Sequence, residues 1–146
     1  MIDPDVRRAD TDVAGQLSWL EAEARASLVD QRGGARWLDT NPARHDGWAE
    51  AIADSHVFVA HIDTVIVGYL ALSVLPPLAR VDEVYVTPQA RELGFGDALL
   101  DAATEAARTE GCSLLEGSSL PGDRNTKNLY ERAGIKARLI TVSTEI

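Results

Sequence analysis

The sequence predicts a mixed α/β domain in which one central sheet has helices on both faces. Two runs rich in β-branched residues, Val57 to Ile62 and Val65 to Val74, are joined by Asp63-Thr64, which suits a hairpin turn. After Pro88 the apolar residues recur at spacings of three and four, the period of a helix. Strand-like and helix-like segments then alternate, which is typical of an α/β fold.

The first third of the chain predicts a short strand, Val6 to Ala9, and then a helix capped by Thr11. The helix should end by Gly33-Gly34. Arg32 to Gly47 contains turn residues and mixed charge and indicates a loop with at most one helical turn, and Trp48 to Ala53 indicates a short helix. The apolar face of the first helix consists of Val13, Leu17, Leu20, Ala24 and Leu28.

The middle of the chain predicts three successive strands, the third running from Arg80 to Val86. Gly68, inside the second strand, indicates a bulge or a close approach of backbone. Pro76-Pro77 should end that strand, because proline cannot donate to a sheet ladder.

The last third predicts a long helix that ends at Gly111 and a strand from Ser113 to Glu116. A short helix, Thr126 to Ala133, should follow and end at Gly134, with Asp123 or Asn125 as candidate caps. A final strand is expected from Ile135 to Ser143. The apolar face of the long helix consists of Phe95, Leu99, Leu100, Ala103 and Ala107.

Composition and charge narrow the class of protein. The 146 residues are 45% hydrophobic and 25% charged, so we expect one folded domain covering residues 1–146. The net charge of −9 argues against nucleic acid or an anionic membrane as partner and is compatible with an amine substrate. Cys112 is the single cysteine, and the three histidines have no ligand spacing, so we expect no disulfide and no metal site.

The N-terminal residues lack the apolar stretch of a signal peptide, and the longest apolar run, Val65 to Leu75, is far shorter than the ~20 residues of a membrane span. We therefore expect a soluble, cytoplasmic protein.

The segment from Arg91 to Gly96 is the part of the sequence that indicates chemistry. A strand leads into a loop with two glycines, and the loop opens directly into a helix. Main-chain N–H groups at a helix start are unpaired and lie at the positive end of its dipole, so they favour an anion such as a phosphate. Arg91 adds a charged donor. The spacing is neither the Gly-x-Gly-x-x-Gly of a dinucleotide fold nor the Gly-Lys-Ser/Thr of a nucleotide triphosphate loop.

These residues resemble the signature of the GCN5-related N-acetyltransferase (GNAT) superfamily. Its acetyl-CoA motif, Arg/Gln-x-x-Gly-x-Gly/Ala behind a strand that ends in a Val-x-Pro-like turn, is matched by Arg91, Gly94 and Gly96 behind Val86-Thr87-Pro88. A second family element, a tyrosine on a short helix followed by a glycine and an apolar residue, is matched by Tyr130 to Ile135. The resemblance spans nearly the whole chain.

The resemblance implies an enzyme that moves an acetyl group from acetyl-CoA to a primary amine by direct attack. It implies a mostly antiparallel sheet in which the fourth strand, Arg80 to Val86, splays from the fifth. The pantetheine arm of CoA would then pair with exposed main chain of the fourth strand, and an N–H near Val86 would polarise the thioester. The implied cofactor-binding residues are Val84, Val86, Arg91, Glu92, Leu93, Gly94, Phe95, Gly96, Asp97 and Asn125.

Two residues have implied catalytic roles. Tyr130 would protonate the CoA thiolate, a role that suits a weak acid held by packing. Glu83 is the candidate base for the acceptor ammonium, because it lies on the strand that forms the cleft, and Asp82 would point to the opposite face of a regular strand. The family often has Asn where this chain has Asp123, so Asp123 becomes a candidate cap and Asn125 or Arg124 a candidate contact to CoA.

The acceptor should be selected by the first helix and by the loop from Arg32 to Gly47. Trp37 could form an apolar wall there and Asp39 an ammonium partner, whereas Trp19 and Trp48 are expected to be core or helix-packing residues.

Two other functions remain open at this point: a non-catalytic acyl-CoA sensor, and a small α/β domain that binds a different phosphate ligand. A homodimer is a further candidate, because an exposed terminal strand from Arg138 to Ser143 would invite pairing.

Overall fold

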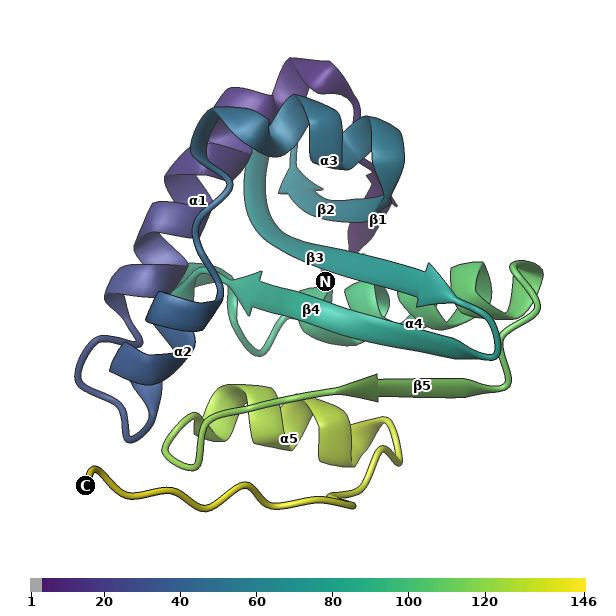
Figure 1. The fold of residues 1–146 in the computed structure, drawn as a ribbon. Coiled ribbons are helices and arrows are strands. Elements are labelled where there is room, and N and C mark those ends of the chain that lie inside the picture. Colours follow the sequence, from purple (N-terminus) through teal and green to yellow (C-terminus); the bar gives the residue numbers. More distant parts are fainter. Residues whose placement is uncertain (1–3) are drawn as a thin grey trace.

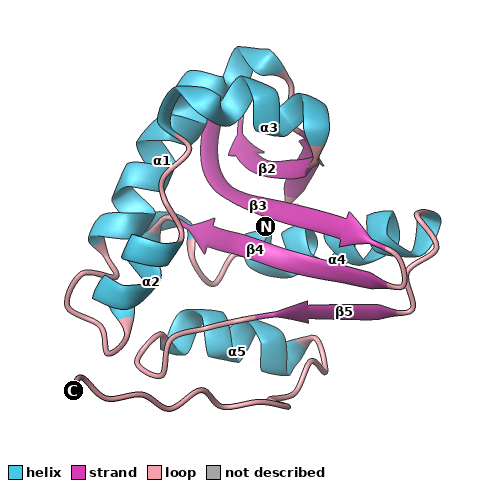
Figure 2. Ribbon diagram, in the orientation of Figure 1, coloured by secondary structure: helices cyan, strands magenta, loops and turns pink. Residues whose placement is uncertain are grey.

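The computed structural model describes residues 4–146, and Figure 1 shows a curved sheet with helices packed against both of its faces. The strands and helices follow the predicted order through most of the chain (Figure 2). The elements are β1 (Asp5–Arg8), η1 (Thr11–Val13), α1 (Ala14–Ala26), α2 (Gly34–Thr40), η2 (His45–Gly47), α3 (Trp48–Asp54), β2 (His56–Ile62), β3 (Val65–Leu75), β4 (Leu78–Val86), η3 (Pro88–Ala90), α4 (Phe95–Thr109), β5 (Leu114–Gly117) and α5 (Arg124–Arg132).

The five strands found within residues 4–146 lie in the order β1-β2-β3-β4-β5. All neighbours are antiparallel except β4 and β5, which are parallel. The mixed α/β class and the mostly antiparallel sheet are therefore confirmed. The parallel pair requires a crossover, and α4 supplies it across one face.

Each face of the sheet has its own apolar core, because alternate residues of a strand point to opposite sides. Phe58 and Leu70 pack with α4 and α5, and Val59 and Tyr69 pack with α1 and with Trp48 of α3. The apolar faces predicted for α1 and α4 point inward as expected, and Leu17, Leu99 and Leu100 are at most 1% exposed.

Two bulges interrupt this alternation. The register between β2 and β3 shifts beside Gly68, where a Cβ would lie 2.8 Å from the Tyr85 carbonyl oxygen, so both the predicted bulge and the close approach occur there. The register between β3 and β4 shifts at Asp82, which is an extra residue in β4. Before that bulge, Val81 faces α4; after it, Val84 faces α4 instead. The extra residue thus changes which residues face α4, from odd-numbered ones before the bulge to even-numbered ones after it.

The strands β4 and β5 separate partway along their length. Their pairing runs from Leu78 with Leu114 to Val81 with Gly117 and then stops. Figure 1 shows the two strands diverging toward their carboxyl ends, with α5 beside β5. In the described part of the chain, the second half of β4 pairs with β3 alone, which confirms the expected splay.

The C-terminal segment departs from the prediction. No strand forms from Ile135 to Ser143, and the chain beyond Gly134 is irregular (Figure 2). Leu139, Ile140 and Val142 are more than 80% exposed, so these side chains have no sheet or core to pack on. The terminal strand edge on which the expected dimer depended is therefore absent from the described chain.

Smaller differences concern the first helices. Asp10, rather than Thr11, accepts the capping hydrogen bond, from the Asp12 amide at 3.0 Å. The first helix ends at Ala26, and the region predicted as a loop contains the separate helix α2. Trp19 was expected to pack but is 82% exposed, because it lies off the buried stripe of α1.

None of the helices within residues 4–146 is long and apolar enough to cross a lipid bilayer.

Candidate active site

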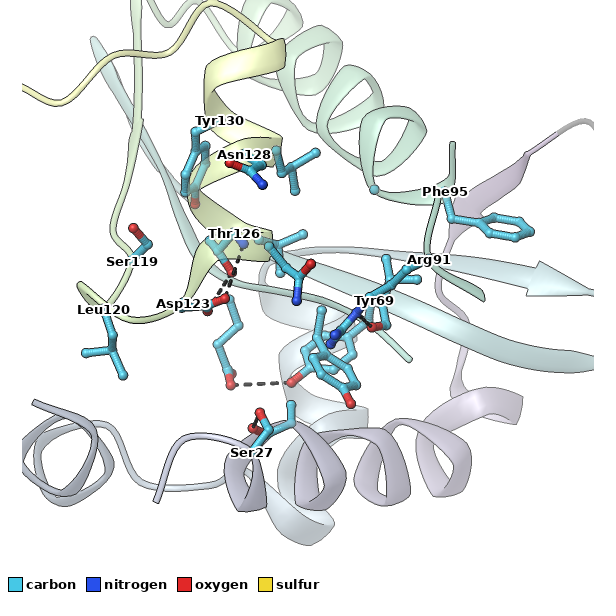
Figure 3. A pocket seen from close by; sticks show the side chains of 18 of the residues that line it. Ser27, Tyr69, Arg91, Phe95, Ser119, Leu120, Asp123, Thr126, Asn128 and Tyr130 are labelled. Atoms are coloured by element: carbon cyan, nitrogen blue, oxygen red, sulfur yellow. Dashed lines mark hydrogen bonds between the residues drawn. The ribbon is translucent and has the colours of Figure 1, made fainter. Parts of the chain in front are cut away.

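A cavity of 580 Å³ occupies the opening between β4 and the end of β5. Its walls come from α1, the second half of β4, the loop before α4, the segment after β5, and α5. Figure 3 shows Tyr130, Thr126 and Asp123 on the α5 side, Tyr69 and Arg91 across from them, and Ser27 at the α1 wall. Of the ten implied cofactor-binding residues and the two implied catalytic residues, every one except Leu93 lines this cavity, whereas Arg124, the alternative CoA contact, does not. Leu93 is 40% exposed on the loop.

The loop before α4 presents a row of unpaired main-chain donors. Within residues 4–146, the N–H groups of residues 92–97 make no hydrogen bond, and the first paired amide of the helix is that of Ala98 to the Gly94 carbonyl, at 3.0 Å. These donors lie at the positive end of the α4 dipole, so together they form a site for an anion.

Two left-handed residues shape this loop, Glu92 with φ of 65° and Gly94 with φ of 89°. Gly94 suits its position because a side chain there would be strained and would meet the ring of Pro4 at 3.0 Å. Gly96 has a different role: a Cβ would lie 3.3 Å from Leu129, so its absence lets α5 pack closely on α4.

Arg91 folds back over the sheet. Its Nε donates to the Val86 carbonyl at 2.9 Å, and its guanidinium lies 5.6 Å from the centre of the Tyr85 ring. The positive charge is thus held at the mouth of the cavity with its two terminal nitrogens unused by these contacts.

The second half of β4 offers an open edge to the cavity. The Thr87 amide donates to the Val67 carbonyl at 2.8 Å, which fixes the alternation of the antiparallel ladder. Residues 85 and 83 then bond to β3, so the main-chain groups of Val84 and Val86 point away from β3, toward the side that β5 has left. An extended ligand can pair with this edge as an added strand.

Tyr130 is placed by α5 at the point where β5 leaves β4. It is 8% exposed, and a Cβ on Gly117 would collide with its hydroxyl, so the phenol sits directly against the last residue of β5. Burial, with a smaller effect from the Asp123 carboxylate, raises the pKa of Tyr130 to about 12. The phenol therefore remains protonated at neutral pH and can act as a proton donor.

Asp123 takes the role of helix cap. Its carboxylate accepts from the Thr126 amide at 3.2 Å and from the Thr126 hydroxyl at 2.7 Å. The prediction that Asp123 caps this helix is therefore confirmed. Asn125 and Asn128 follow on α5, and both line the cavity as side-chain amides.

Glu83 points to the α1 side of β4 and lies in a cluster of charges. Its carboxylate pairs with Arg44, lies 3.5 Å from Arg25 and accepts from the Tyr69 hydroxyl at 3.4 Å. Burial raises its pKa above the usual value, against the opposing effect of the two arginines. Asp82, at the bulge, accepts instead from the Ser73 hydroxyl.

The arginines beside Glu83 are held by Glu21, which is 1% exposed. This carboxylate accepts from the Arg44 and His45 amides and from the Trp48 indole at 3.3 Å, and both guanidiniums lie 3.8 Å from it. The sequence did not reveal this cluster, because Arg44 and Glu83 lie 23 and 62 positions beyond Glu21, although Arg25 is only four positions away. A glutamate that interrupts the apolar face of an amphipathic helix was the one available signal.

A second cavity of 250 Å³ adjoins the first and shares Trp37, Asp82 and Glu83 with it. Trp37 was expected as a wall of the acceptor site, and it lines both cavities. Asp39, its expected partner, lines neither.

The profile of the acetyltransferase (GNAT) family matches residues 17–135, so the chain belongs to this family of acetyltransferases. A sequence search of curated proteins returns no significant match. Among solved structures, the tetramutant of protein BH1408 from Bacillus halodurans superposes with a TM-score of 0.78 at 16% identity, over all of both chains.

Two further structures with a similar fold belong to acetyltransferases that are named for different acceptors. The aminoglycoside acetyltransferase AAC(6')-Iy, in complex with a CoA-based bisubstrate analogue, has a TM-score of 0.72 at 17% identity, over 99% of this chain and 100% of its own. The ribosomal-protein-alanine N-acetyltransferase from Brucella melitensis biovar Abortus 2308 has a TM-score of 0.70 at 19% identity, over the same shares.

Proposed function

We propose that this protein transfers an acetyl group from acetyl-CoA to a primary amine by direct attack. The observation that carries the proposal is the row of unpaired amides from Glu92 to Asp97 at the start of α4. The CoA pyrophosphate is an anion that fits such a row, and Arg91 lies beside it with charged donors to spare.

The rest of the cavity suits the rest of the co-substrate. The pantetheine arm is an extended chain with amide groups, and the open edge at Val84 and Val86 offers main-chain partners for it. The Val86 carbonyl is bonded to Arg91, so pairing there uses the Val86 amide or displaces that contact. Asn125 lies on the α5 side as a further contact.

Acetyl-CoA supplies an activated acyl group, and the chain supplies position and proton transfer. The main-chain N–H near Val86 stabilises negative charge on the carbonyl oxygen. Glu83 accepts a proton from the acceptor ammonium, directly or through water, which frees the nitrogen lone pair for attack. As the C–N bond forms and the C–S bond breaks, Tyr130 donates its proton to the departing sulfur. The proton that the new amide nitrogen loses restores the Tyr130 phenol, directly or through water.

The acceptor side is the second cavity, since Glu83 forms part of the wall of both. The similar structures act on an aminoglycoside and on a ribosomal protein, so likeness of fold favours neither a small molecule nor a protein as acceptor.

Calorimetry with CoA, ATP and NAD, followed by thiol-release assays with acetyl-CoA and a broad amine panel, tests the proposal. We expect binding of CoA alone among the three and thiol release with at least one amine. Tyr130→Phe should lower kcat by about 100-fold while CoA binding changes little. Absence of CoA binding would overturn the proposal.

The second candidate function is a non-catalytic acyl-CoA sensor, which the pairing of Glu83 with two arginines favours. A sensor would bind acetyl-CoA but would release no thiol with any amine. Its affinity for acetyl-CoA would be the same in the wild type and in Tyr130→Phe.

A further inference from the structure

The second cavity has a charged wall that the proposed transfer does not explain. Arg44, Arg25, Asp82 and Glu83 line it, so two cations and two anions face 250 Å³ of space. A site that only had to attract an ammonium group would need the acids alone.

Arg44 has donors left over on this wall. Its Nη1 pairs with Glu83 and Glu21, whereas its Nε and Nη2 make no hydrogen bond within residues 4–146. Its side chain is 26% exposed, and the Trp48 ring holds the guanidinium at 4.7 Å. Arg25 is more enclosed, at 12% exposed, and its Nη1 already donates to the Asn41 carbonyl.

We propose that the acceptor is a small amine with a carboxylate beside its amino group, as in a free α-amino acid, and that Arg44 binds that carboxylate. This inference rests on the proposed acetyl transfer. The ammonium would lie toward Asp82 and Glu83, and the carboxylate would take the unused edge of the Arg44 guanidinium, a geometry suited to a bidentate pair.

The charges on the wall are compatible with this acceptor. Glu21 and Glu83 balance Arg25 and Arg44, and Asp82 adds one further negative charge. An α-amino acid matches such a wall, because its ammonium meets the carboxylates and its own carboxylate meets Arg44. A polycationic amine would instead bring further positive charge against two guanidiniums.

The size of the cavity points the same way. Pockets for drug-sized ligands measure roughly 300–1,000 Å³, and this one is smaller. A single amino acid therefore fits within the cavity, whereas a larger amine would extend beyond it.

The test compares each of the common amino acids with its C-terminal amide, which keeps the size and the amine but removes the negative charge. Spermidine and a tripeptide serve as polycation and peptide-terminus probes. For the best acceptor, we expect kcat/KM for the acid to exceed that for the amide by roughly 10-fold to 100-fold. Equal rates, or a preference for the amide, spermidine or the tripeptide, would overturn the inference and leave acetyl transfer intact.

Arg44→Gln should reduce the ratio of acid to amide to within about twofold. Arg8→Gln is the matched control, because Arg8 also stacks on an aromatic ring, Phe58 at 5.0 Å, but lies away from both cavities. Its ratio should equal that of the wild type. If Arg44→Gln does not fold, the ratio of acid to amide is measured for Arg44→Lys and compared with the ratio for the wild type.

Absence of thiol release with every amine would count against the proposed function. In that case, titration of the amino acids and their amides into CoA-loaded protein tests the acceptor site by itself. Binding without preference for the acids would then overturn this inference as well.

Discussion

The hydroxyl of Tyr130 lies directly against Gly117, the residue at which β5 ends its pairing with β4. The proposed proton donor is thus positioned by the absence of a side chain on the neighbouring strand. The contact also places the phenol at the apex of the opening between the two strands, where a ligand that pairs with β4 would pass.

Gly117→Ala should therefore displace the phenol and lower kcat by about 10-fold or more, while the affinity for CoA changes little. Steady-state thiol release and calorimetry measure the two quantities. In the Tyr130→Phe background the same substitution should have little further effect on kcat, since the group it displaces is already gone. Independent, multiplicative losses would contradict the positional role.

Gly94→Ala should abolish most of the CoA binding, because an alanine is strained at φ of 89° and the loop must shift its amides to accommodate it. Gly111→Ala is the matched control, with φ of 87° at the far end of α4 and no atom within 4 Å of the added Cβ. Both variants should lose about 1–2 kcal/mol of stability in urea titrations. Calorimetry should show CoA binding by the Gly111 variant alone.

The rate should depend on pH through Glu83. Burial raises its pKa above the usual 4.5, so kcat/KM should fall as the pH drops through a value higher than that of an ordinary carboxyl group. Glu83→Gln should lose this limb and keep only the limb of the acceptor amine. Because the pKa of Tyr130 is raised to about 12, no falling limb from the phenol should appear up to about pH 10.

The raised pKa of Glu83 also makes the stability of the fold depend on pH. A pKa raised in the folded state means that folding favours the protonated carboxyl, so its stabilising contribution is full below pH 4.5 and is lost as the pH rises through the folded value. Urea titrations of the wild type and Glu83→Gln across this range should diverge accordingly. A constant difference between the two would contradict the shift.

Glu21→Gln should lower the free energy of unfolding by about 3 kcal/mol, because it removes the buried charge that balances two guanidiniums. Glu105→Gln is the matched control. Glu105 pairs with Arg108, but both side chains are at least 67% exposed, so its removal should cost less than about 1 kcal/mol. Equal losses in urea titrations would show that the buried cluster contributes no more than a surface pair.

Local patterns predicted much of the fold. The helix faces, the hairpin at Asp63-Thr64 and the glycine ends at Gly111 and Gly134 all depend on spacings within a few residues, and all appear in the structure. The final strand failed for a different reason. The β-branched residues between Leu139 and Val142 favour extended chain, but a strand needs a partner, and no neighbour along the sequence specifies one.

The main-chain donors of the candidate site could be predicted from the sequence, whereas the surroundings of its charged side chains could not. Gly94 and Gly96 mark a turn into a helix, and a helix start has unpaired amides whatever the tertiary fold. The environment of Glu83 depends on Glu21, Arg25 and Arg44, which come together only when α1 and the loop before α3 pack on the sheet. Strand alternation alone could not place Asp82 relative to Glu83, because alternation assumes a regular strand and Asp82 lies at a bulge.

That bulge makes position 82 a place where β4 can lose a residue without changing which side chains face each cavity. Leu72 pairs with Val81 and Ala71 with Glu83, so the chain on either side of Asp82 already follows the alternation of β3. Deletion of Asp82 would close the ladder and leave Glu83 and Tyr85 on the α1 side and Val84 on the α4 side. A chain one residue shorter at this bulge would therefore keep both cavities and would lack only the Asp82 carboxylate from their walls.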